Sequence, residues 1–101
     1  MPSDIIQTTL QTAHMRECVV LMDDYGSQHR LYIKVSQASE RGNIIASEQA
    51  AMNARQTELE AYAAANNHDL STQKLTTIAA KQAKLTTVKT QSGSIAKAKT
   101  K

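Results

Sequence analysis

Two β-rich runs joined by a short turn sequence constrain the fold of this chain more than any other feature. The runs span residues 17–22 and 30–35, and each contains three Val, Leu or Ile side chains. Asp24-Tyr25-Gly26-Ser27 lies between them and supplies turn-forming residues, with Gly26 free to adopt a positive φ. We therefore predict a β-hairpin over residues 17–35.

The register of this hairpin follows from a two-residue loop at Tyr25-Gly26, which fixes which residues of the two strands lie opposite each other. Slipping by one residue would place Val20 opposite Arg30 and Glu17 opposite Ile33, which separates the apolar partners. The predicted pairs are Val20–Leu31, Cys18–Ile33, Met22–His29, Val19–Tyr32 and Glu17–Lys34.

A continuous helix through residues 4–41 is the competing interpretation. Ile6, Leu10, Val20 and Leu31 stay roughly in phase along such a helix. It would carry Gly26 in its middle and a dense cluster of β-branched residues, and both lower the helix propensity. The hairpin is favoured, and an all-α helical hairpin or bundle remains the alternative fold class.

The segment before the hairpin, residues 3–15, is predicted to be a short helix. Ser3 is a suitable N-cap, and Ile6, Leu10 and Ala13 share one face. Three threonines in the segment weaken the helix, because β-branched side chains lose rotamer freedom there.

The clearest predicted helix spans residues 44–66, which follow a linker at 36–43 and contain many Ala but no Gly or Pro. Its apolar line, Ile45, Met52 and Leu59, has heptad spacing and is flanked by Tyr62. So narrow a seam is typical of one helix packing on another.

A second helix is predicted over residues 72–91, where Leu75, Ile78 and Leu85 share a side that Lys74 and Lys81 interrupt. It would pair with helix 44–66 as a helical hairpin. Together these elements predict an α+β domain over residues 1–91, followed by a disordered basic tail over 92–101.

Strong core-forming side chains are scarce in this chain. Ile, Leu and Val make up 18 of its 101 residues, and both Phe and Trp are absent. This proportion lies just below roughly 20%, the lower limit expected of globular chains. It excludes a deep enclosed active site and indicates that folding or function depends partly on a partner.

Charge is distributed unevenly along the sequence. All nine acidic residues precede residue 71, whereas residues 71–101 carry seven lysines and no acidic residue. Such a segment can attract phosphates without reading a base sequence, so we regard non-specific nucleic-acid binding as the alternative function. The candidate anion contacts are Lys74, Lys81, Lys84, Lys89, Lys97, Lys99 and Lys101.

Residues with reactive side chains form no recognisable catalytic or metal-binding pattern. The single cysteine, Cys18, excludes an internal disulfide, and its spacing from His14 supplies too few ligands for zinc. Asp23 and Asp24 are better explained as turn residues than as an acid–base pair. We expect no enzymatic activity, no metal, no cofactor and no small-molecule substrate.

The sequence contains neither a secretory signal nor an apolar run approaching the ~18 residues of a membrane helix. We therefore expect a cytoplasmic protein, or one incorporated into a particle assembled there.

These features favour a structural or interaction protein that oligomerises or docks onto a larger complex, for example a component of a phage particle or a secretion machine. A two-stranded hairpin is marginal alone and its edges invite another strand. The predicted packing or interface residues are Val20, Leu31, Ile33, Ile45, Met52, Leu59 and Tyr62.

Overall fold

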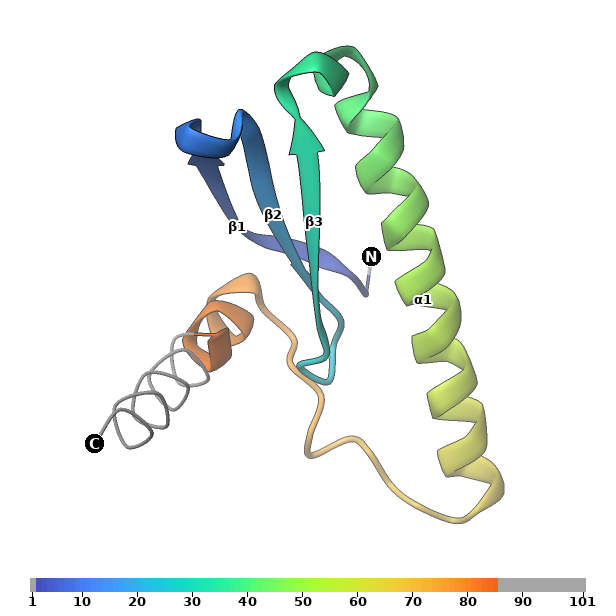
Figure 1. Cartoon of the computed structure of the whole chain (residues 1–101). Helices are drawn as coiled ribbons and strands as arrows, with labels where there is room; N and C mark the ends of the chain where they lie inside the picture. Colours follow the sequence, from blue (N-terminus) through green and yellow to red (C-terminus); the bar gives the residue numbers. More distant parts are fainter. Residues whose placement is uncertain (1, 86–101) are drawn as a thin grey trace, which may run out of the picture.

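The chain folds as a three-stranded antiparallel sheet between a long helix and the C-terminal segment (Figure 1). The computed structural model describes residues 2–85. The α+β prediction is confirmed, and the all-α alternative is wrong. The elements are β1 (Asp4–Gln11), the 3-10 turn η1 (Thr12–His14), β2 (Arg16–Met22), β3 (Gln28–Lys34), the 3-10 helix η2 (Val35–Glu40) and α1 (Arg41–Ala65), and residues 78–85 are also helical.

The N-terminal helix predicted over residues 3–15 is wrong, because Asp4–Gln11 forms strand β1. β1 pairs antiparallel with β2, and a register shift between Ile5 and Gln7 marks a β-bulge at Ile6. Ile and Thr fill much of this segment and favour extended backbone. Pairing with the apolar strand β2 therefore overrides a weak helical periodicity.

The predicted hairpin is confirmed as β2 and β3, but its predicted register is wrong by one residue. Val20 lies opposite Arg30 and Glu17 lies opposite Ile33, which is the slipped arrangement. The prediction treated β2 and β3 as an isolated pair. In the structure β2 is the central strand, and its apolar side chains are buried by elements above and below the sheet rather than by their neighbours on β3.

The connection between β2 and β3 is longer than the predicted two-residue loop. The Asp23 carboxylate accepts hydrogen bonds from the backbone N–H groups of Tyr25 and Ser27, both at 2.9 Å. This confirms the turn role predicted for Asp23. Gly26 has a φ of +87°, which is the left-handed conformation expected of it. The wider loop accounts for the shift in register.

Helix α1 covers one face of the sheet. It begins earlier than predicted, at Arg41, because the predicted linker over residues 36–43 is largely helical and η2 leads directly into α1. Ile45 and Met52 pack against the odd-numbered side chains of β2 and against Ile33, so the predicted seam lies on a sheet and not on another helix. Leu59 is 41% exposed, and Figure 1 shows α1 continuing beyond the sheet.

The C-terminal segment covers the opposite face of the sheet, so the predicted helical hairpin is wrong. Leu75 and Leu85 pack with Ile6 and with Cys18, Val20 and Met22 of β2. Residues 74–76 belong to no helix or strand, and the helix starts after Thr77, whose hydroxyl accepts a hydrogen bond from the Ala80 N–H at 3.0 Å. Residues 86–91 of the predicted helix, and the predicted tail, lie outside the described residues.

Lys81 binds the C-terminal segment to the sheet. Its side chain is 1% exposed, and its Nζ donates hydrogen bonds to Asp4 Oδ2 at 2.7 Å and to Asp24 Oδ1 at 2.9 Å. The carbonyl oxygens of Pro2 and Met22 accept further bonds from the same ammonium group. Burial lowers the pKa of Lys81, but the two carboxylates outweigh that effect and raise it.

Asp24 links all three layers. Its carboxylate accepts hydrogen bonds from Lys81 and from Gln56 of α1, while its carbonyl oxygen accepts one from the Leu75 N–H at 2.7 Å. Burial raises the pKa of Asp24, but the bonds from Gln56 and Lys81 outweigh burial and lower it. Gln56 is thus a polar residue at a buried position of α1, where a hydrophobic residue would be usual.

Replacing Lys81 with Met would leave the carboxylates of Asp4 and Asp24 without their shared counterion. We expect Lys81→Met to lower the free energy of unfolding by about 3 kcal/mol, near the lower end for breaking a buried pair, because both carboxylates keep some contact with water. Urea denaturation measures the loss. Lys84→Met, on the same helical stretch but exposed, is the control and should change stability by less than about 0.5 kcal/mol. Equal effects of the two substitutions would contradict this role of Lys81.

Candidate functional site

The residues predicted as packing or interface positions divide between the interior and the surface. Leu59 and Tyr62 are exposed, at 41% and 71%. The other five belong to the two apolar cores, so they serve packing within the chain: Val20, Leu31, Ile33, Ile45 and Met52.

The lysines predicted to contact anions are partly engaged inside the molecule. Lys81 is buried, and the Lys74 ammonium lies 3.5 Å from Glu60 and 3.9 Å from Asp24. Lys84 extends across the β2–β3 loop close to Gly26. Lys89, Lys97, Lys99 and Lys101 lie outside the described residues. Nucleic-acid binding by this segment stays a prediction.

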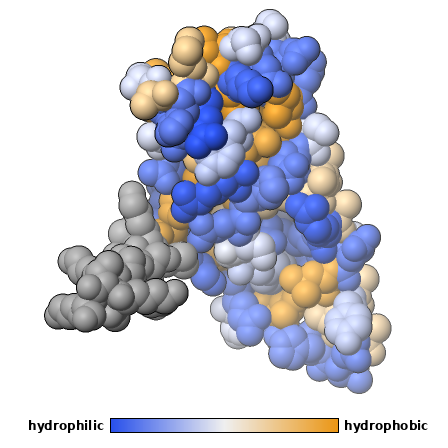
Figure 2. All heavy atoms as spheres, viewed as in Figure 1, coloured by the Kyte–Doolittle hydropathy of each residue, from blue (hydrophilic) through white to orange (hydrophobic). Residues whose placement is uncertain are grey.

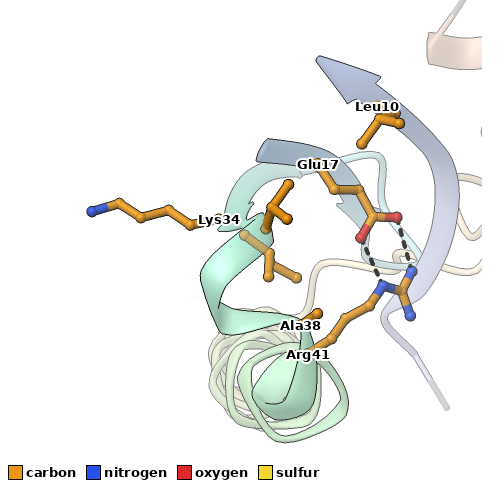
Figure 3. Close-up of a pocket in the computed structure, with 7 residues that line it drawn as sticks. Leu10, Glu17, Lys34, Ala38 and Arg41 are labelled. Atoms are coloured by element: carbon orange, nitrogen blue, oxygen red, sulfur yellow. Dashed lines mark hydrogen bonds and ion pairs between the residues drawn. The ribbon is translucent and has the colours of Figure 1, made fainter. Parts of the chain in front are cut away.

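An apolar hollow of about 360 Å³ opens at the end of the sheet where β3 runs into η2 (Figure 3). Its walls come from distant parts of the sequence, which the sheet brings together. Leu10 lies on β1, Ile33 at the end of β3, and Val35 and Ala38 on η2. We call these four residues, with Glu17, Lys34 and Arg41 at their margin, the hairpin-end surface.

Two of the apolar walls of the hollow are exposed to solvent. Leu10 is 64% exposed and Val35 is 52% exposed. α1 begins beside them at Arg41, so it covers the sheet farther along and leaves this end open. Apolar atoms reach the surface at this end of the molecule (Figure 2).

Glu17 and Arg41 form the polar margin of the hollow. Arg41 Nε donates to Glu17 Oε1 at 2.7 Å, and Nη2 donates to Oε2 at 3.1 Å, so the pair is bidentate (Figure 3). The hydrogen bonds from Arg41 lower the pKa of Glu17. The predicted partner of Glu17 was Lys34, and the change of register explains why Arg41 takes that place.

A second cation lies on the opposite face of the sheet from the hollow. The Arg16 guanidinium lies 4.1 Å from the centre of the Tyr32 ring, and its Nε donates to Gln11 Oε1 at 2.7 Å. The ends of the three strands are thus tied together by side chains.

The hollow has the chemistry of a binding surface. Glu17 and Arg41 pair with each other, Lys34 lies at the margin, and the remaining walls are aliphatic. Cys18 is buried on the opposite face of the sheet. Within residues 2–85, no group of three His, Cys, Asp or Glu side chains is arranged to hold a metal ion. None of the described helices is long and apolar enough to cross a membrane.

Sequence reasoning missed the hairpin-end surface because it placed Leu10 on a helix and Val35 inside the hairpin. The available signal was the run of β-branched residues before Leu10, which favours a strand and would have put Leu10 beside Glu17. Comparison with protein families, curated proteins and solved structures finds no match to this chain.

Removal of Arg41 should release the carboxylate of Glu17. We expect Arg41→Met to raise the pKa of Glu17 toward its ordinary value, because that carboxylate loses both hydrogen bonds and the nearby positive charge. An NMR titration of the side-chain carboxyl carbon measures it. The pair is partly exposed, so stability should fall by less than about 1 kcal/mol. An unchanged titration would show that the two groups do not interact in solution.

Proposed function

We propose that this chain is a non-enzymatic assembly or interaction protein that binds a protein surface through its hairpin-end surface. The observation that carries the proposal is the apolar hollow between Leu10 and Val35, which remains open although both faces of the sheet are covered. Exposed apolar patches with a polar margin are typical of sites that bind other proteins.

The form of the hollow supports a protein partner. An aliphatic side chain of a partner could enter between Leu10 and Val35, while its neighbouring polar groups meet Lys34 and the Glu17–Arg41 pair. Because Glu17 and Arg41 already neutralise each other, a partner need not supply a counterion for either of them. The thin apolar composition agrees with a small protein that gains stability by assembling.

The function is tested by isolating the native assembly and rebuilding it from purified components. We expect Val35→Asp/Ala38→Asp to abolish assembly, because both side chains lie exposed at the hollow and a carboxylate there would be desolvated by the partner. Both substitutions are on η2 and should leave the circular dichroism spectrum unchanged. Light scattering measures the mass of the assembly.

Leu59→Asp is the matched control, since Leu59 is also exposed and apolar but lies on α1 away from the hollow. Assembly should survive this substitution. Loss of assembly with Leu59→Asp alone would instead place the interface on the helical seam. A chain that is monomeric in its native source would contradict the proposed function.

A further inference from the structure

Within residues 2–85, the outer edge of β1 is open beyond its bulge, where no charged residue or proline guards it against strand pairing. Within the described residues β1 pairs only with β2 and lies at one side of the sheet. Residues 5–11, Ile-Ile-Gln-Thr-Thr-Leu-Gln, include no charged residue and no proline. Natural edge strands are commonly guarded by such residues, because unpaired backbone groups otherwise recruit another strand.

The opposite edge of the sheet is guarded. β3 carries Arg30 and Lys34, and His29 lies between them and the loop. Pairing of β3 with a second β3 would bring the like charges of Arg30 and Lys34 together, which disfavours it. The two edges therefore differ in charge, and β1 is the edge open to self-pairing.

The bulge in β1 limits the length of strand that can be paired. The register shift lies between Ile5 and Gln7, and the Ile6 carbonyl oxygen already accepts a hydrogen bond from the Gln82 side chain at 3.1 Å. Beyond the bulge, Gln7–Gln11 pairs regularly with β2. The side chains of residues 7–10 are exposed.

We infer that a second copy of this chain pairs with this edge, β1 against β1 in antiparallel orientation, forming a six-stranded sheet. The inference rests on the proposed function: it names a second copy as one partner, and it adds the β1 edge, which shares Leu10 with the hairpin-end surface. Centring the pair on the regular stretch puts Thr9 opposite Thr9, Gln7 opposite Gln11, and Thr8 opposite Leu10. The segment is thus complementary to itself, as a two-fold interface requires.

The pairing also covers apolar surface. Thr8 and Leu10 lie opposite Val19 and Glu17 of β2, so both side chains point to the face that carries α1. In the dimer each Leu10, 64% exposed in the single chain, would contact Thr8 of the second copy. Both open edges are used in one closed contact, which makes a dimer rather than a fibre.

Two double variants test the pairing and its register. In Gln7→Glu/Gln11→Glu, like charges face each other twice across the dimer, and we expect the dimer to weaken by at least about tenfold. In Gln7→Lys/Gln11→Glu, a basic and an acidic side chain face each other twice, and the dimer should persist; neither position lines the hollow, and the Gln11→Glu change keeps an acceptor for Arg16. Sedimentation equilibrium gives the dissociation constants, and circular dichroism confirms that both variants fold.

Either of two other outcomes would overturn the inference. Equal self-association of the two variants would show that copies meet through another surface. A wild-type chain that stays monomeric at millimolar concentration would show that β1 does not pair with itself. Neither result touches the proposed function, because the Val35→Asp/Ala38→Asp variant leaves β1 unchanged and tests the hollow separately.

Discussion

The burial of the sheet on both faces depends on the hydrogen bonds and ion pairs of the Lys81 ammonium group. It joins the start of β1, the end of β2 and the C-terminal helical stretch through Asp4, Met22 and Asp24. An almost fully buried lysine is tolerated only where its charge and donors are matched, and here four oxygens surround it. The C-terminal segment is thereby held over a face of the sheet that would otherwise be open.

Burial of the sheet on both faces explains how so few apolar residues suffice to form the interior of the protein. Cys18–Met22 of β2 is buried throughout, and the side chains on each face of this strand belong to a separate small core. Polar residues complete the interior where apolar ones are lacking. Ser3 is held by Asn53 and by the Gln49 carbonyl oxygen, and Gln56 is bonded to Asp24. Among the described residues, apolar side chains do not cover the end and the outer edge of the sheet. The hollow and the open edge of β1 remain there.

Local patterns predicted the elements whose signals are local. The β2–β3 hairpin followed from its β-rich runs and Gly26, and α1 followed from its Ala-rich sequence. The seam residues Ile45 and Met52 lie in an apolar core, but the sequence could not show that their partner is a sheet.

The errors arise where contacts between distant residues decide the structure. β1 is stabilised by its pairing with β2, and the register of β3 follows from a loop that is wider than two residues. Lys81 looked like an interruption of an apolar stripe, because its carboxylate partners are more than fifty residues away in sequence. The hollow was missed for the same reason, since its walls converge only when β1 joins the sheet.

Acylation of the lysines in the native protein tests the burial of Lys81 most directly. An amine-selective reagent should modify Lys84 rapidly and leave Lys81 unmodified, because the Lys81 ammonium is enclosed and fully hydrogen-bonded. Peptide mass spectrometry reads the two positions separately, and both should react once the protein is unfolded in urea. Modification of Lys81 at the rate of Lys84 in the native protein would contradict the proposed dependence of the fold on this group.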